Sequence, residues 1–245
     1  MKKLILIFIL ALASSAQATL ILNEQFDYPD GSLDGQGAWS RHSGTAGQIQ
    51  VAGNAISVND AQSEDVNVNL GISLGATESI FAGFDLSVTA STPVGGSDYE
   101  YFAHFGTGSS DFTARVDVVA PTSVGDYSLG ISAGTIAEAV WISDLTFGTT
   151  YRAIIGYNRA TGLAQLWVDA ANMGDTFISS TTADDNAVSG FYLRESASTA
   201  NETIQIDNLL VATTFGEAVS AIPEPSSFAL LALGIAGLVG IRRRR

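Results

Sequence analysis

Residues 19–222 consist of short runs with the periodicity of β-strands. Runs rich in Val, Ile, Phe, Tyr and Thr alternate with clusters of Gly, Asn, Asp, Ser and Thr, which is typical of strands joined by turns. No helix of three turns is evident between them. We therefore expect an all-β fold, one large antiparallel two-sheet sandwich. The expected strands are 19–26, 49–51, 55–58, 66–70, 79–88, 99–105, 112–119, 127–131, 151–157, 163–168, 191–193 and 204–211.

Two stretches carry the clearest strand patterns. In Ile80–Val88 the even positions 80, 84, 86 and 88 are apolar, whereas Asp85 and Ser87 fall on the opposite face. Farther along, the runs 151–157 and 163–168 flank a short polar loop that ends in a glycine. This arrangement predicts a β-hairpin.

The two ends of the chain differ from this pattern. Met1-Lys2-Lys3 precedes an apolar run, and Ala16-Gln17-Ala18 follows it as a small-x-small cleavage site. These features predict a secretory signal peptide over residues 1–18, with signal cleavage directed by Ala16 and Ala18. The alternative is an uncleaved anchor, but the apolar run is shorter than the roughly 17–25 residues that a membrane span requires.

The middle of the chain is strongly acidic. Residues 19–222 contain 24 Asp and Glu, five Arg and no Lys, which leaves a net charge near −19. Such a charge favours solubility and disfavours binding to nucleic acid, while cation binding stays open. Cysteine is absent, which excludes thiol catalysis, Cys-type zinc sites and disulfides. About 200 residues bury a sufficient core without disulfides.

The C-terminal segment combines three elements in order. Pro223, Glu224 and Pro225 cannot form regular structure and stay extended. Residues 226–241 then predict a short transmembrane helix. A basic block closes the sequence as a stop-transfer signal on the cytoplasmic side: Arg242, Arg243, Arg244 and Arg245. Sixteen residues span only about 24 Å as a helix, so a simple amphiphilic tail is the alternative.

Pro-Glu-Pro followed by an apolar segment and terminal arginines resembles the PEP-CTERM sorting signal of Gram-negative bacteria. The resemblance covers about 24 residues and implies recognition by an exosortase, a membrane cysteine protease. It further implies an inner-membrane-anchored intermediate that is transferred to the cell envelope surface or extracellular matrix, in a host that makes exopolysaccharide. It implies nothing about the activity of the middle region.

The middle region itself resembles concanavalin A-like or laminin-G-like jelly rolls. The resemblance implies a jelly-roll fold and, because its residues look structural, it supports a fold more than an activity. The matching segments are 23–28 with Gly31 and Trp39, 101–105, 114–116, 129–132, 148–151, 166–168 and 206–209.

Calcium is the metal that the acidic loops would suit. Asp30 and Asp34, with Asp27 nearby, place carboxylates in an Asp/Gly-rich loop, but position twelve is Arg41, which excludes an EF-hand. The alternative is an ordinary Asp/Gly turn. A second oxygen-rich loop lies at 184–186.

Carbohydrate binding is the other candidate, because exposed aromatic rings stack on sugars. Trp39, Trp141 and Trp167 are the candidate contacts. The alternation around Trp167 points its ring away from the side that Leu166 and Val168 share.

Catalysis finds little support in the sequence. Asp98 and Glu100 alternate on one expected strand, as a glycosidase pair could, but Phe occupies the position where a third acid is expected. His42, in a Ser/Gly-rich loop, and His104, in a strand, are far apart, so a serine triad lacks a positioned histidine. We expect a non-enzyme with no catalytic residue.

The sequence thus predicts four parts: a signal peptide 1–18, an ectodomain 19–215, a linker 216–222 and a sorting signal 223–245. We expect an exported surface or matrix protein whose ectodomain is structural or adhesive. A lectin-like module that binds carbohydrate or calcium is the alternative, and a glycoside hydrolase comes third. The expected partners are the exosortase, the membrane before processing, and exopolysaccharide.

Overall fold

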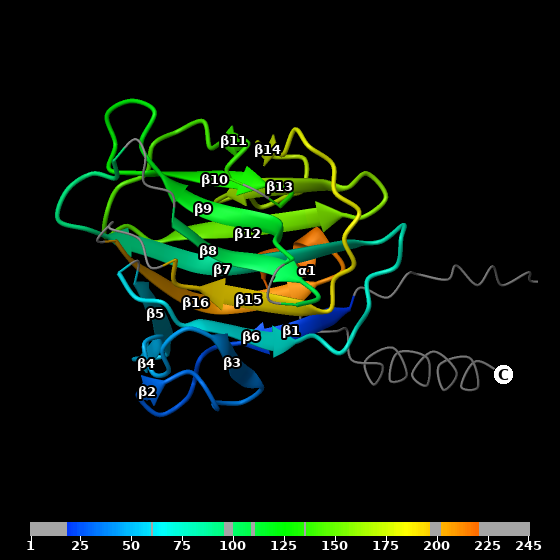
Figure 1. Ribbon diagram of the computed structural model, residues 1–245. Helices are drawn as coiled ribbons and strands as arrows, with labels where there is room; N and C mark the ends of the chain where they lie inside the picture. Colours follow the sequence, from blue (N-terminus) through cyan, green and yellow to red (C-terminus); the bar gives the residue numbers. More distant parts are fainter. Residues whose placement is uncertain are drawn as a thin grey trace, which may run out of the picture.

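A computed structural model describes residues 19–59, 61–95, 100–108, 111–134, 136–196 and 202–220 (Figure 1). The predicted signal peptide 1–18 and the sorting signal 223–245 lie outside these residues, as does Asp98. Among the described residues no helix has the length and apolarity needed to cross a bilayer.

The described residues form sixteen strands and one short helix, arranged as two stacked antiparallel sheets. Sheet A contains β1 (Leu20–Glu24), β2 (Gly31–Ser32), β4 (Gln50–Ala52), β5 (Ala55–Asn59), β7 (Ser79–Thr89), β12 (Tyr151–Asn158), β13 (Leu163–Val168), β14 (Ile178–Ser179) and β16 (Thr203–Ala212). Sheet B contains β3 (Trp39–Ser43), β6 (Asp65–Asn69), β8 (Glu100–Gly106), β9 (Thr113–Val119), β10 (Ser128–Ser132), β11 (Ala139–Val140) and β15 (Gly190–Arg194).

The strand order interleaves distant parts of the sequence. Sheet A runs β14-β13-β12-β7-β16-β5-β4-β2, with β1 paired to the second half of β16. Sheet B runs β11-β10-β9-β8-β15-β6-β3. The predicted all-β two-sheet sandwich is therefore confirmed, and all twelve expected strands are present with bounds that differ by a few residues.

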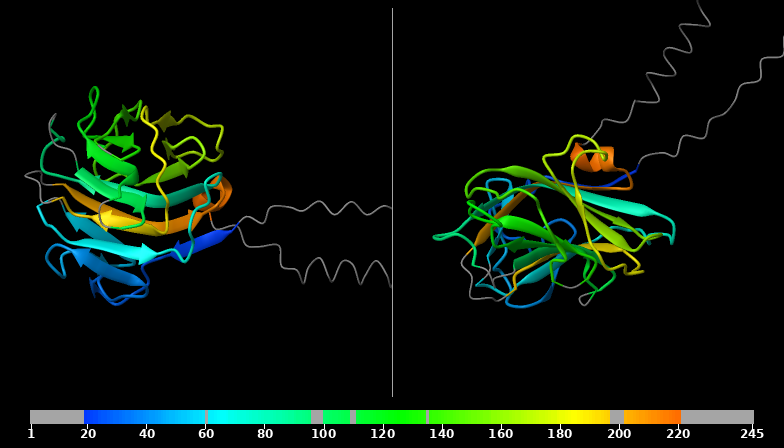
Figure 2. Two further views of the ribbon diagram at one scale, coloured as in Figure 1. Left: turned by 45° about the vertical axis from the view of Figure 1, so that its right-hand side comes forward. Right: turned by 90° about the horizontal axis from the view of Figure 1, so that it is seen from above.

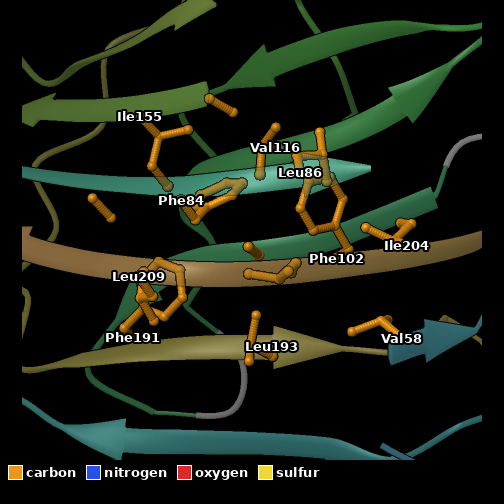
Figure 3. Close-up of a cluster of buried hydrophobic side chains, with 14 of the residues drawn as sticks. Val58, Phe84, Leu86, Phe102, Val116, Ile155, Phe191, Leu193, Ile204 and Leu209 are labelled. Atoms are coloured by element: carbon orange, nitrogen blue, oxygen red, sulfur yellow. The ribbon is translucent and has the colours of Figure 1, made fainter. Parts of the chain in front are cut away.

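The main core fills the space between the sheets. Figure 3 shows side chains of both sheets meeting there, with Phe84 and Ile204 of sheet A beside Phe102 and Phe191 of sheet B. Phe84 packs edge-on against Phe102, with ring centroids 6.0 Å apart. All of these side chains are fully buried, so each contributes about 1.5–3 kcal/mol through the apolar area it removes from water.

β7 confirms the predicted alternation and adds a second layer to it. Its even positions face the main core, while Asp85 and Ser87 lie on the outer side of sheet A. Phe81 also points outward, where it joins a separate buried cluster with Trp167 and Phe215. Phe215 belongs to the helix α1 (Phe215–Val219), which covers this part of sheet A (Figure 2).

The hairpin of β12 and β13 is present in the predicted place. Its loop closes on Asn158, whose carbonyl accepts the Gly162 amide across 2.8 Å, and Gly162 takes a positive φ of 70°.

Two other elements differ from what the sequence predicts. Trp39–Ser43, expected as a loop, forms β3 at the edge of sheet B because its backbone pairs with β6. The fold also continues through α1 into the stretch expected to be a linker.

Candidate functional site

The three tryptophans considered for sugar stacking are all buried. Trp39 is 2% exposed, Trp141 7% and Trp167 0%. The Trp39 indole donates to the Glu24 carboxylate across 3.0 Å. Trp167 points away from the main core, as predicted, but its ring packs against Phe215 with centroids 4.9 Å apart. Stacking on a sugar needs an exposed ring face, which none of these residues presents; their positions correspond to structural roles.

The carboxylates considered for calcium hold backbone groups of different segments. Asp34 accepts the Arg41 amide across 2.8 Å, and Asp30 accepts the Gly53 amide across 3.3 Å. Asp27 is exposed. Within the part of the chain that the structure describes, no group of three or more His, Cys, Asp and Glu residues is placed to hold a metal ion. In the second acidic loop, 184–186, the carboxylate of Asp185 is also occupied by a protein group, since it forms an ion pair with Arg159 across 3.0 Å.

The strongest concentration of functional side chains lies on the outer face of sheet B, the face turned away from the main core. Strand alternation in β6, β9 and β15 turns polar or aromatic side chains to this side, and register shifts in β8 bring Tyr101 and His104 to the same side. We call this set the sheet B face. Its members are His42, Asp65, Asn67, Tyr101, His104, Phe112, Arg115, Asp117, Tyr192 and Arg194.

Aromatic rings and arginines interleave on this face. The Arg115 guanidinium lies 4.0 Å from the centre of the Tyr101 ring, and that of Arg194 lies 5.0 Å from the same ring. His104 stacks on Tyr192, with centroids 4.8 Å apart and planes only 6° from parallel. The contacts link three strands, β8, β9 and β15, into one continuous layer.

The two histidines, far apart in sequence, converge here. His42 of β3 meets the edge of Tyr192 with ring centroids 5.4 Å apart, and His104 stacks on the same ring. The sequence offered no sign of this, because β3 was read as a loop. The separation in sequence that argued against a shared site does not hold in space, although no third metal ligand joins them among the described residues.

Both arginines are paired with buried carboxylates. Arg115 donates to Asp117 through Nη2 across 2.6 Å and through Nε across 3.1 Å. Arg194 lies 2.9 Å from Asp65, which also accepts the Ser43 hydroxyl. The face is therefore close to neutral, within a domain of net charge near −19.

Several buried polar atoms of this face have no hydrogen-bond partner. They are three acceptors, His104 Nε2, Asp117 Oδ2 and Asp65 Oδ1, one donor, Arg194 Nε, and both ring nitrogens of His42. Leaving such a group unpaired costs about 1–3 kcal/mol, so these six atoms give the face an unusual number of unused hydrogen-bonding groups.

The chemistry of His104 follows from its surroundings. Its Nδ1 donates to the Phe105 carbonyl across 2.9 Å, which leaves Nε2 with its lone pair as an acceptor. Burial is the main cause that lowers the pKa of His104 to about 3, and the cationic Arg194 adds to the effect. His104 is therefore neutral at physiological pH and accepts, rather than donates, at Nε2.

Asp117 is shifted in the opposite direction. Burial raises its pKa to about 6, and the attraction of Arg115 only partly offsets this rise. At neutral pH Asp117 is mostly a carboxylate with one free oxygen. The face thus presents bare acceptors beside aromatic rings, an arrangement that suits a ligand with several hydroxyl donors and an apolar ring surface. Access to the buried acceptors requires neighbouring side chains such as Phe112 to turn aside.

Comparison with known proteins gives one match in sequence. The family profile described as PEP-CTERM protein-sorting motif matches residues 221–245. No curated protein matches the chain. The motif indicates an exported protein that is sorted to the cell envelope and processed by an exosortase.

Solved structures match the β-sandwich. A structure titled "Sialidase" is 15% identical with a TM-score of 0.52; the match covers 90% of this chain and 21% of that one, so this chain spans about a fifth of its length. Lectin UEA-II complexed with galactose and lectin II from Ulex europaeus are each 13% identical with TM-scores of 0.50, covering 80% of this chain and 100% of theirs. At these identities the likeness shows the fold alone.

The expected concanavalin A-like fold is consistent with these neighbours. Their ligands and activities are properties of those proteins. The chain carries a PEP-CTERM protein-sorting motif on the C-terminal side of a jelly-roll β-sandwich.

Proposed function

We propose that this exported protein is retained at the cell surface or in the matrix and that its β-sandwich binds carbohydrate through the sheet B face without catalysis. The observation that carries the proposal is the group of unpartnered buried acceptors, His104 Nε2, Asp117 Oδ2 and Asp65 Oδ1, set among aromatic rings. Sugar hydroxyls donate to such acceptors, and the apolar face of a sugar ring packs on an aromatic ring that is not fully buried, for which this face offers Tyr101 and Phe112.

The absence of catalysis is part of the proposal. Glycoside hydrolysis needs two carboxyl groups about 5–9.5 Å apart. Asp65 of β6 and Asp117 of β9 are separated by β15 and β8, which places their strands about 14 Å apart. Each carboxylate is also engaged by its own arginine. This geometry favours binding over hydrolysis.

A glycan array tests the binding, with matched arginine variants as the comparison. We expect the ectodomain to bind at least one glycan class, and Arg194→Lys to weaken binding about tenfold, which is about 1.4 kcal/mol, because lysine lacks the Nε donor and the planar guanidinium. Arg41→Lys is the control, since Arg41 also pairs with an aspartate but lies off this face. Equal loss in both variants, or no glycan binding at all, contradicts the proposal.

A screen for glycanase activity tests the second half of the proposal. We expect none in the wild-type protein. Asp98→Asn and Glu100→Gln provide the decisive comparison, because this pair is the one the sequence suggests. Activity in the wild type that disappears in both variants would show that the protein is a hydrolase.

A further inference from the structure

The described chain leaves the sandwich beside a groove on the outer side of sheet A. This exit groove has a volume of about 470 Å³. It is lined by Asn23 of β1, Gln25 just after β1, Arg152 of β12, Asn208 and Leu210 of β16, and Ser220. Ser220 directly follows α1 and is the last residue described. The groove therefore sits where the domain meets the sorting segment.

α1 is held firmly against the sheet, which fixes this exit point. Phe215 packs on Phe81 and Trp167, with centroids 5.9 and 4.9 Å away. Arg152 donates from Nη2 to the Ala218 carbonyl across 2.7 Å. The approach is so close that a Cβ at Gly83 would lie 2.0 Å from that carbonyl oxygen. Glycine is required there to let α1 dock.

The sorting motif begins almost at once after this fixed point. Only Ala221 and Ile222 separate Ser220 from Pro223. Three Cα-to-Cα steps reach at most about 11 Å. An enzyme that binds residues 223–225 must therefore stand within about this distance of Ser220, which lines the exit groove, unless α1 detaches.

We propose that the exit groove is a docking surface for the sorting protease, in addition to the motif itself. Its chemistry suits a polar, uncharged loop of the partner. The exposed amides of Asn23 and Gln25 both donate and accept, and Leu210 adds an apolar wall. Arg152 is neutralised by Asp85, 3.1 Å away, so no strong charge selects an ionic partner. The proposal rests on processing at the motif but not on carbohydrate binding.

Processing kinetics in the native host test the docking surface. Pulse labelling and intact-mass spectrometry measure how fast the C-terminal segment is removed. We expect the double variant Asn23→Ala/Gln25→Ala to slow removal at least threefold. The control Asn69→Ala/Gln50→Ala changes the same residue types away from the groove and should process at the wild-type rate. Equal rates in the groove variant and the wild type overturn the proposal.

Two further variants separate docking from its alternatives. Ten Gly/Ser residues inserted between Ser220 and Ala221 should make processing insensitive to the groove substitutions, because the enzyme no longer stands against the domain. Phe215→Ala loosens α1; faster processing in this variant would show that α1 must detach and would overturn the docking proposal. Replacing Pro223, Glu224 and Pro225 with alanine tests the motif alone, so failure of sorting is distinguishable from failure of docking.

Discussion

Individual carboxylates in this protein hold loops together by accepting backbone amides. Glu64 is fully buried and accepts the amides of Gly47, Gln48 and Ile49 at 2.6–3.0 Å. Glu195 accepts the amide of Glu64 in turn, across 2.9 Å. Asp144 and Glu138 bind other loops in the same way. Desolvation is the largest single influence on the pKa of each and raises it, but the several hydrogen bonds together lower both pKa values. This chain has no cysteine to form disulfides, and some of its many carboxylates instead hold loops together through hydrogen bonds.

Replacing Glu64 with alanine should be costly. The substitution leaves three backbone donors without their acceptor, for which we expect a loss of about 3 kcal/mol in the free energy of unfolding. Urea denaturation measures it. Asp185→Ala is the matched control, because its exposed ion pair with Arg159 should contribute less than about 1 kcal/mol. Similar losses in both variants would mean that the hydrogen bonds of Glu64 stabilise the fold no more than an exposed ion pair does.

Asp117 should make the protein less stable as the pH rises. Its folded pKa of about 6 lies above the ordinary aspartate pKa of 3.8, so its favourable contribution is complete below pH 3.8 and lost as the pH rises through 6. Between pH 5 and pH 8 we expect Asp117 to cost about 1.4 kcal/mol and Asp117→Asn to remove this loss, while the buried His104, whose pKa is lowered, changes stability in the opposite direction in both proteins. Urea denaturation at both pH values measures the difference.

Glu195 acts in the same direction, because burial raises its pKa to about 7, so part of the pH dependence should persist in Asp117→Asn. Asp144 and Glu138 do not interfere in this range, since their pKa values are lowered and their contributions are lost only in stronger acid. An identical pH dependence in the variant and the wild type would contradict the assignment.

At the scale of elements, α1 is the clearest case of structure imposed by tertiary packing. It has five residues and no side-chain bond at its N-cap, so it cannot be stable alone. Docking by Phe215 against Phe81 and Trp167 keeps it in place. The helix completes a second small core on the outer side of sheet A.

Phe215→Ala should lower the free energy of unfolding by about 3 kcal/mol, since it opens a cavity beneath α1. Trp167 fluorescence should shift to the red because its ring becomes hydrated. Phe177→Ala is the control, as Phe177 also contacts Trp167, at 5.5 Å, but is 45% exposed. An unchanged spectrum in Phe215→Ala would show that α1 does not cover the indole.

Elements with strong local patterns were predictable from sequence, and those fixed by distant contacts were not. The alternation in β7 and the β12–β13 hairpin identify themselves over a few residues. β11 and β14 have two residues each and therefore no period to detect. β3 has a Ser-rich sequence and forms because β6 offers it an edge. The sheet B face could not be predicted from the sequence for the same reason, because only the order of the strands in sheet B brings its residues together.

At the scale of the whole molecule, the net charge near −19 should make stability depend on salt. Like charges repel across the folded domain, and added salt screens them. We expect the melting temperature to rise when NaCl increases from 10 to 150 mM. Calcium chloride at matched ionic strength should give no larger rise, because Asp30 and Asp34 already bind backbone amides. A calcium-specific increase would reveal a binding site.

The position of β16 in the sheet has a consequence for the timing of folding. It pairs with β7 on one side and with β5 and β1 on the other, although it is the last strand among the described residues. Thr19 at the start of the domain donates to Thr213, 194 positions later. Contacts so distant in sequence make folding slow. If the chain crosses the membrane from its N-terminus, sheet A cannot be completed until β16 has emerged. Most of the domain therefore stays unfolded during export.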